Sequence, residues 1–409
     1  MRINILFLSL LDFDNLDERN IYTDLLTEFE KNGHKLSIIS PIESKTKRET
    51  EILSVNENCR ILKLRIGNIQ KTNIIEKGIS TIRLEKQFIN GIRKYFSDIS
   101  FDLILYSTPP VTFQKVVDYV KKRDNAKSYL LLKDIFPQNA VDLNKLDKNS
   151  VVYKYFRHKE KKLYLASDYI GTMSQKNSGY IVENNPFLKN KMIEVNSNSI
   201  RVEKRNHTEN DDLRKQIDVD KNDILLLYGG NLGIPQGIDF LLEIAGFIET
   251  EQGVSLAIVG SGTEYGKIKS FLVKNELTST KLIKQLPKNE YHALEASADV
   301  GLIFLDSRFT IPNIPSRMLG YMQAGLPVLA ATDANTDLKD FLLDGDYGFW
   351  SEHGDLAGFK KNLSMLKDPV LRKDMGNNSY EYLKNNFDVS VSYKKIIRHF
   401  SEGNDNVGK

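Results

Sequence analysis

Short apolar runs alternate with longer amphipathic stretches along most of this chain. In the first half, the apolar runs predict strands at residues 3–10, 35–40, 101–106, 128–132 and 168–173. Amphipathic stretches between them predict helices at 20–32 and 113–123. The second half repeats the pattern, with predicted strands at 223–228, 254–259, 280–285, 300–305 and 328–331. This rhythm predicts parallel sheets covered by helices on both faces.

A polar stretch separates the two series. Between Val195 and Asp223 the rhythm lapses into NSNSIRVEKRNHTENDD, which is typical of an interdomain linker. We therefore predict an α/β protein with two doubly wound parallel-sheet domains, residues 1–203 and 204–387. A last helix, at 392–400, follows a domain that already looks complete. In such folds a ligand binds at the carboxyl ends of the strands.

Composition narrows the class of protein. The 409 residues are 41% hydrophobic with a net charge of +3, which fits a folded protein and not a dedicated nucleic-acid binder. Cys59 is the single cysteine, so no intrachain disulfide can form. Acidic residues follow the first apolar run at once and no small-x-small cleavage site appears, which favours a buried strand over a signal peptide. We expect a cytoplasmic protein.

Two glycine-rich segments follow predicted strands in the second half. Gly229-Gly230-Asn231-Leu232-Gly233 comes after an apolar strand, and Pro235-Gln236-Gly237 then opens a helix. Such glycines let a backbone approach phosphate, and a helix start attracts anions, although a tight turn without ligand is the alternative. Gly260-Ser261-Gly262 follows the next strand, but its spacing misses both the dinucleotide fingerprint and the P-loop. We interpret it as a second turn lining the same crevice.

A third segment, residues 304–330, combines charge with a predicted helix start. Asp306 and Arg308 lie in a loop that ends at Pro315, and Ser316 is expected to bond the free N–H groups of the helix behind it. Arg308 and Arg317 could supply fixed charge for a diphosphate. Surface arginines near helix starts are also common.

The first half offers a carboxylate and a polar loop. Asp134 follows a strand, where it could orient or deprotonate a hydroxyl or simply satisfy a turn. The loop from Ser9 to Arg19 contains Asp12 and Asp14, which mimic a metal-binding D-x-D. Because this loop belongs to the other domain than the glycine turns, we favour a polar loop over a metal site. The histidines have no metal-ligand spacing, and we expect His34 to be structural.

Residues 65–98 are both basic and apolar. Such a stretch can rest on an anionic lipid surface, or it can be an ordinary helix with one buried face. The residues concerned are Arg65, Lys71, Lys77, Arg83, Lys86, Arg93 and Lys94 among Ile74, Ile75, Ile79, Ile82, Phe88, Ile89, Ile92 and Phe96.

At these residues the chain resembles a bacterial retaining glycosyltransferase of the GT-B fold, in the large family 4. The resemblance rests on YGGNLGIPQGIDFLL, AIVGSGTEYGKIK, the Gln285-Leu286-Pro287 turn and PSRMLGYMQAGLPVLA. In the first domain, NGHKLSIISP, ILYSTPP and LLLKDIFPQNAVDL are similar to the subgroup that builds capsule and O-antigen repeat units. The resemblance implies two Rossmann-like domains facing a central cleft, with residues 388–409 returning to the first domain.

The resemblance also implies roles for individual residues. Asp134, Arg308 and Arg317 would serve catalysis, and no metal or other cofactor is expected. The acceptor would meet Ser9, Asp12, Asp14 and Arg19. The donor would meet Gly229, Gly230, Asn231, Gly233, Gln236, Gly260, Gly262, Lys284, Gln285, Leu286, Asp306, Pro315 and Ser316.

The chain departs from the family pattern at four positions. Pro312 and Gly320 stand where many members have two glutamates, the second of which holds the nucleotide ribose. Asn231 and Gln236 stand where an arginine and a lysine are usual in the first phosphate turn. The diphosphate charge would then be balanced by helix N-termini together with Arg308, Arg317 or Lys284.

The function expected from these features is transfer of a sugar from a nucleoside diphosphate, UDP by preference, to a lipid-linked or oligosaccharide hydroxyl. The resemblance implies retention, surface polysaccharide synthesis and a protein that can sit on the inner face of the plasma membrane. A sugar-nucleotide epimerase and a catalytically weak sugar-nucleotide-binding partner of another transferase are the alternatives.

Overall fold

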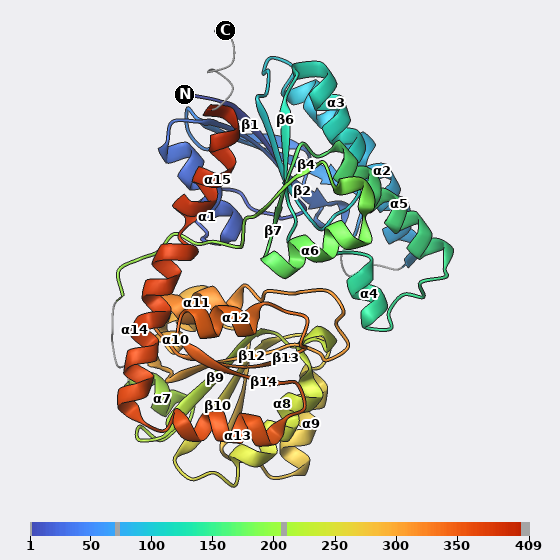
Figure 1. The fold of residues 1–409 in the computed structure, drawn as a ribbon. Coiled ribbons are helices and arrows are strands. Elements are labelled where there is room, and N and C mark those ends of the chain that lie inside the picture. Colours follow the sequence, from blue (N-terminus) through green and yellow to red (C-terminus); the bar gives the residue numbers. More distant parts are fainter. Residues whose placement is uncertain (1, 70–73, 206–210, 402–409) are drawn as a thin grey trace. The chain divides into compact units, whose positions relative to one another are not determined.

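The computed structural model describes the chain except residues 1, 70–73, 206–210 and 402–409 (Figure 1). The chain forms two compact units, Met1–Arg201 with Val389–Lys409, and Val202–Asp388. The boundaries predicted from the polar stretch differ from these by one or two residues. Both units are parallel-sheet α/β domains, as the alternating pattern predicts.

Unit 1 contains a sheet in the order β3-β4-β2-β1-β5-β6-β7-β8. Its neighbouring strands are parallel except β3 and β4. The antiparallel edge strand β3 was not predicted, because its sequence EILS alternates only weakly. The strands are β1 (Asn4–Leu8), β2 (Lys35–Glu43), β3 (Glu51–Ser54), β4 (Cys59–Ile66), β5 (Leu103–Ser107), β6 (Lys127–Leu131), β7 (Tyr169–Thr172) and β8 (Met192–Val195).

The prediction that Pro41 ends the second strand is wrong. β2 continues to Glu43, and Pro41 lies opposite Leu64 of β4. The pairing of β2 with β1 stops at Ile39, so Pro41 has a strand neighbour on one side only. Proline is tolerated in a sheet at such an edge position.

Helices cover both faces of this sheet (Figure 1). α1 and α15 pack on one face, where Leu26, Phe29 and Ile396 are fully buried, and α2, α3 and α5 cover the other. The helices of the unit are α1 (Ile21–Lys31), α2 (Ile74–Tyr95), α3 (Gln114–Asp124), α4 (Gln138–Asp142), α5 (Val151–Ala166), α6 (Gln175–Asn184) and α15 (Val389–Ser401), with short 3-10 turns η1 (Ser44–Thr46) and η2 (Pro186–Leu188).

The last helix returns to unit 1, as expected from the resemblance. The ring of Tyr393 on α15 meets Phe29 edge-on, with 5.0 Å between centroids. The Tyr393 hydroxyl lies 3.0 Å from Nε2 of His34, and the Nδ1 atom of His34 accepts a bond from the backbone N–H of Ile3. His34 therefore joins α15 to the start of the sheet, which confirms its structural role.

Unit 2 contains a fully parallel sheet in the order β11-β10-β9-β12-β13-β14. α8, α9 and α13 cover one face, and α10, α11 and α12 the other (Figure 1). The strands are β9 (Ile224–Asn231), β10 (Val254–Ser261), β11 (Thr280–Lys284), β12 (Val300–Phe304), β13 (Val328–Thr332) and β14 (Gly348–Glu352). The helices are α7 (Asp211–Gln216), η3 (Ile234–Gln236), α8 (Ile238–Ile248), α9 (Tyr265–Lys274), α10 (Lys288–Ser297), α11 (Arg317–Ala324), α12 (Leu338–Asp344), α13 (Leu356–Met365) and α14 (Pro369–Asn386).

Candidate functional site

The two glycine-rich segments lie side by side at the carboxyl edge of the unit 2 sheet. β9 and β10 pair in register there, with Gly230 opposite Gly260 and Asn231 opposite Ser261. The prediction that the strand before the first glycine segment ends at residue 228 is therefore wrong. β9 continues to Asn231, because Gly229 and Gly230 also pair with β10. After them, the backbone N–H of Leu232 donates to the Ser261 carbonyl over 2.9 Å. The sequence placed both segments at one edge, and the pairing confirms that.

Most of these glycines are required by the protein's own packing. A Cβ atom at Gly260 would lie less than 3.0 Å from the Gly230 carbonyl oxygen, and one at Gly262 would meet the Leu232 carbonyl equally closely. A Cβ at Gly229 would overlap the Tyr291 hydroxyl. Gly230 has a φ of +121°, and a Cβ atom built there would meet nothing closer than the Arg317 guanidinium, at 3.7 Å. Of these four glycines, Gly230 is the one whose Cβ position lies beside a guanidinium.

Arg317 is held in place at the first position of α11. Its guanidinium lies over the Tyr228 ring, 4.6 Å from the centroid, and its Nη2 donates to Gln236 Oε1 over 2.5 Å. Its Nη1 is buried and has no hydrogen-bond partner among the described residues. Stacking on the ring and the bond to Gln236 fix the orientation of the guanidinium.

One expectation for residues 304–330 is wrong. Ser316 makes no capping bond through its side chain, because its backbone is already helical with φ −64° and ψ −20°. The Arg308 guanidinium binds both carboxylate oxygens of Asp306 at 2.8 and 2.7 Å, and its role toward a diphosphate stays a prediction. Burial works against ionisation of Asp306, but the Arg308 guanidinium outweighs it and lowers the pKa of that carboxyl. Pro315 precedes α11, as predicted.

The other predicted donor residues surround the same edge. Lys284 is exposed at the end of β11, opposite Gly260 in the ladder. Ser261 Oγ donates to Gln285 Oε1 over 2.8 Å, and Leu286 follows before α10 begins. Gly233 precedes η3, whose last residue, Gln236, accepts the hydrogen bond from Arg317. The roles of these residues toward a donor stay predictions.

A buried polar cluster behind this edge was missed by the sequence analysis. Tyr321 Oη accepts a bond from the Gly229 N–H at 3.1 Å. Glu295 on α10 is 3% exposed and accepts from His292 Nδ1 at 2.8 Å, and burial raises the pKa of its carboxyl. Its Oε1 lies 2.5 Å from where a Gly320 Cβ would be, so Glu295 fills the space beside Gly320. Tyrosine and glutamate at helical spacing look like ordinary helix residues in a sequence.

In unit 1, Asp134 lies just beyond the carboxyl end of β6. Both of its carboxylate oxygens accept from Asn139 Nδ2 at 2.8 Å, and burial raises the pKa of the carboxyl. The Thr108 hydroxyl accepts from the Asp134 N–H and donates to its carbonyl, which fixes the loop. Asp134 is thus positioned by the protein, although its role toward an acceptor stays a prediction.

Lys133, beside Asp134, was not singled out from the sequence. Among the described residues its Nζ has no hydrogen-bond or ion-pair partner, and burial lowers the pKa of the ammonium to about 7. A lysine directly after the apolar run YLLL was the available signal. The charged form of Lys133 is therefore destabilised, as at many functional sites.

The loop from Ser9 to Arg19 is organised by a buried lysine. Lys63 of β4 is fully buried, and its Nζ forms ion pairs with Asp12 and Asp14 and donates to the Phe13 carbonyl. The D-x-D pair therefore binds an ammonium group, which agrees with the polar-loop interpretation. Arg19 pairs with Asp24 at 3.3 Å, and the buried Ser9 hydroxyl accepts from the Leu11 N–H. Ser9 and Arg19 thus have partners within the protein.

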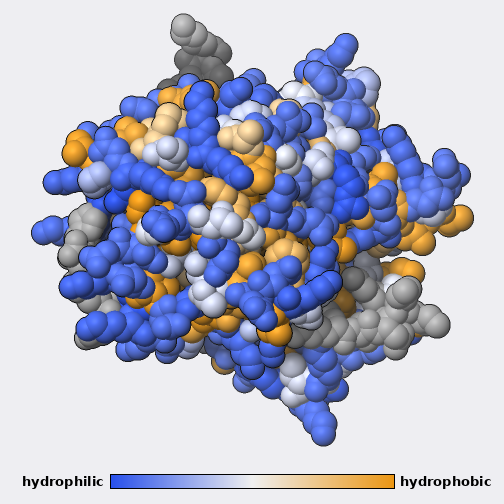
Figure 2. Space-filling view, turned by 90° about the horizontal axis from the view of Figure 1, so that it is seen from below, coloured by the Kyte–Doolittle hydropathy of each residue, from blue (hydrophilic) through white to orange (hydrophobic). Residues whose placement is uncertain are grey.

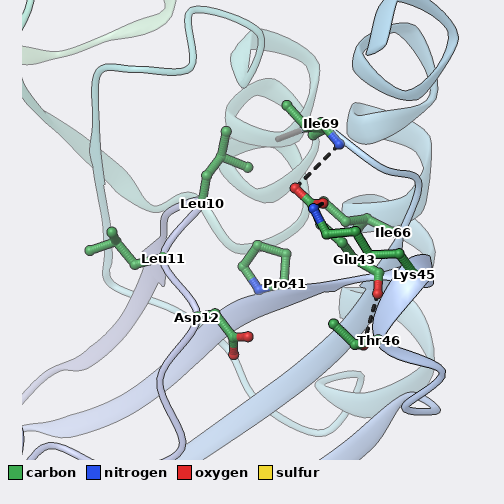
Figure 3. A pocket seen from close by; sticks show the side chains of 9 residues that line it. All are labelled: Leu10, Leu11, Asp12, Pro41, Glu43, Lys45, Thr46, Ile66 and Ile69. Carbon is green, nitrogen blue, oxygen red and sulfur yellow. Dashed lines mark hydrogen bonds and ion pairs between the residues drawn. The ribbon is translucent and has the colours of Figure 1, made fainter. Parts of the chain in front are cut away.

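A pocket of about 290 Å³ opens beside this loop, at the carboxyl ends of β2 and β4 (Figure 3). Asp12 is the predicted acceptor residue that lines it. Glu43, also in the lining, accepts from the Ile69 N–H at 3.2 Å and pairs with Lys45. The lining residues are Leu10, Leu11, Asp12, Pro41, Glu43, Lys45, Thr46, Ile66 and Ile69. Within the described ranges, no group of three His, Cys, Asp or Glu side chains could hold a metal ion.

Gly260→Ala tests the close approach of the two strands. We expect a loss of about 2–4 kcal/mol in the free energy of unfolding, because the new methyl overlaps the Gly230 carbonyl. Gly266→Ala is the matched control: its Cβ would meet nothing within 4 Å on α9, so it should be neutral or stabilise by up to about 1 kcal/mol. Urea denaturation measures both, and equal stabilities would contradict the packing described.

Lys133→Met tests the unpartnered ammonium by its pH dependence. Between pH 7 and the ordinary value of 10.5, the unfolded chain binds more protons at Lys133 than the folded chain, so wild-type stability rises with pH. The free energy of unfolding of the variant lacks this rise with pH, because position 133 no longer titrates. It should exceed that of the wild type by the largest amount below about pH 7, and the difference should shrink toward pH 10.

Denaturation curves at several pH values measure this difference. Lys127→Met, at an exposed position on β6, is the control and should run parallel to the wild type. A Lys133→Met difference that does not change with pH would show that the ammonium is not destabilised.

The comparisons with known proteins bear on the family and the fold of the chain. Residues 209–382 match the family model for glycosyl transferases group 1. The chain is 21% identical over 370 residues to the probable glycosyltransferase WbjE of Pseudomonas aeruginosa, covering 88% of each. It shares its fold with sucrose-phosphate synthase of Thermosynechococcus elongatus (TM-score 0.75, 16% identity, 98% and 99% of the two chains).

A second solved structure shows the same fold. It is Alr3699/HepE of Anabaena in complex with UDP and glucose (TM-score 0.69, 14% identity, 98% and 100% of the chains). The chain thus has the GT-B fold, and its matches support a glycosyltransferase of group 1.

Proposed function

We propose that this protein transfers a sugar from a nucleoside diphosphate, uridine diphosphate by preference, to a hydroxyl of a lipid-linked or oligosaccharide acceptor. The observation that carries the proposal is Arg317. Its guanidinium is fixed next to Gly230, and its Nη1 lacks a hydrogen-bond partner in the part of the chain that the structure describes. A diphosphate oxygen is a ligand that this donor and the adjoining backbone edge can bind together.

The same arrangement suits the chemistry of transfer. Breaking the bond between sugar and diphosphate places negative charge on the leaving phosphate. A cation already oriented toward that charge stabilises the transition state without having to rearrange. Arg308 serves this purpose less well, because Asp306 neutralises it.

The nucleotide preference is supported by a structural neighbour. HepE binds UDP and glucose, and its fold aligns with nearly all of this chain. The proposal includes a preference for uridine. It also includes retention of configuration and a place in surface polysaccharide synthesis, and these two parts come from the sequence resemblance. Asp134, held by Asn139, would orient the acceptor hydroxyl, while the leaving phosphate takes its proton.

Binding and turnover distinguish the proposal from its alternatives. A thermal-shift screen of UDP-, GDP- and dTDP-sugars identifies the donor, because a ligand bound only by the folded chain raises its melting temperature. Release of UDP that depends on an added acceptor supports transfer. Binding without any turnover indicates a partner protein, and isomerised UDP-sugar without acceptor indicates an epimerase.

Arg317→Met should weaken UDP binding about 10- to 100-fold, because a hydrogen bond to a charged group is lost at the phosphate. Arg308→Met is the matched control and should change the affinity by less than about threefold, since that guanidinium is already paired. Calorimetric titration with UDP measures both. Equal losses in the two variants, or none in Arg317→Met, would contradict the assignment of Arg317 to the phosphate.

A further inference from the structure

Many cations of unit 1 lie at the surface, where water solvates them. In the basic stretch at residues 65–98, Leu84, Phe88 and Ile92 of α2 are buried, which fits the ordinary-helix interpretation. The exposed cations of this helix are Arg83, Lys86, Arg93 and Lys94, and Lys71 lies outside the described residues. Hydrophilic side chains also cover most of the face drawn in Figure 2. No helix among the described residues is long and apolar enough to cross a membrane.

Lys133 differs from these cations, because it is half-buried. Burial alone lowers the pKa of its ammonium to about 7, and no charged group of the described residues contributes to that change. The fully buried Lys63 has Asp12 and Asp14 as partners, whereas Nζ of Lys133 has none among the described residues. An ammonium that the chain leaves uncompensated in such a position is stabilised most by an anion that a ligand brings.

The backbone of Lys133 is fixed at the carboxyl edge of the unit 1 sheet. Oγ1 of Thr108, just after β5, accepts from the N–H groups of Lys133, at 3.1 Å, and Asp134, at 3.2 Å. On the other side, the Leu132 N–H donates to the Gly171 carbonyl of β7 over 2.8 Å. Lys133 is thus held between two neighbouring strand ends, at the edge where parallel α/β sheets bind their ligands.

Groups that can bind hydroxyls lie beside this lysine. The Asp134 carboxylate accepts from Asn139 and forms no ion pair with Lys133 among the described residues. Burial raises the pKa of Tyr22 on α1, a hydrogen bond with Ser107 opposes the rise, and the nearby Asp134 charge adds to it. A carboxylate and a phenol are both able to bind sugar hydroxyls. Because neighbouring Cα atoms are about 3.8 Å apart, one molecule can meet Asp134 and Lys133 together.

We infer that Lys133 binds an anionic group of the acceptor, a phosphate or a carboxylate, so that the acceptor is a phosphorylated or acidic sugar. This inference rests on the proposed function, since it takes the molecule that Asp134 orients to be the acceptor. A lysine suits this role because its ammonium is a compact point charge that accepts either anion. The anion stabilises the charged form of Lys133, so binding near neutral pH should take up a proton.

NMR of the full chain with isotope-labelled lysine tests the inference, and the signal lost in Lys133→Met identifies the ε-methylene group of Lys133. Sodium phosphate and sodium acetate are the probes, with sodium chloride keeping the ionic strength constant. At saturation, phosphate, acetate or both should raise the pKa of Lys133 by at least about one pH unit. A response to acetate alone supports a carboxylate on the acceptor, and a response to phosphate alone supports a phosphate. The signal of Lys127, exposed on β6, is the control and should not respond.

A pKa of Lys133 that neither anion changes would overturn the inference. UDP distinguishes the acceptor from the donor. A response of the Lys133 signal to UDP that disappears in Arg317→Met would also overturn the inference, in favour of the donor diphosphate.

Failure of this inference differs from failure of the proposed function. If UDP binds through Arg317 while Lys133 ignores both anions, sugar transfer stands and the acidic acceptor is refuted. If Lys133 responds to an anion but the chain binds no sugar nucleotide, sugar transfer is refuted and the acceptor role of Lys133 with it.

Discussion

The close approach of β9 and β10 at their carboxyl ends determines what the unit 2 edge can contain. Side chains at Gly229, Gly260 and Gly262 would overlap Tyr291 or the neighbouring backbone. Those three positions are therefore bare backbone, and the charge beside Gly230 comes from another element. Arg317 of α11 supplies it across Gly230, with its guanidinium held by Tyr228 and Gln236. In this account the glycines serve first to bring the strands together, and only through that packing to admit a ligand.

Unit 1 shows how burial and pairing decide the behaviour of a lysine. Lys63 is fully buried, yet Asp12 and Asp14 compensate its charge, and the result is an ordered loop beside the pocket of Figure 3. Within the described ranges Lys133 has no such partner, and burial lowers its pKa to about 7. A buried charge that the protein leaves uncompensated is typical of a site that binds another group. A buried charge that is compensated, such as Lys63, indicates a structural role.

The sequence predicted the architecture well, because buried parallel strands and amphipathic helices leave strong periodic signals. It also placed the two glycine segments at one edge. It missed the antiparallel strand β3, the passage of β2 through Pro41 and the continuation of β9 through its glycines, since each depends on strand neighbours far away in the chain.

Side-chain pairing was less accessible from the sequence. Arg308 and Arg317 look equivalent there, but Asp306 neutralises one and Tyr228 supports the other. Nothing in the residue order predicts that Glu295 fills the space beside Gly320, or that Lys63 binds the D-x-D pair. These outcomes follow from three-dimensional packing.

A crystal structure of the chain with UDP tests the central claim most directly. The account predicts a diphosphate oxygen about 2.7–2.9 Å from Nη1 of Arg317, the usual length of a charge-assisted hydrogen bond, with the phosphate against Gly230. A diphosphate bound away from this edge, or an Nη1 that stays without a partner while UDP is bound, would contradict it.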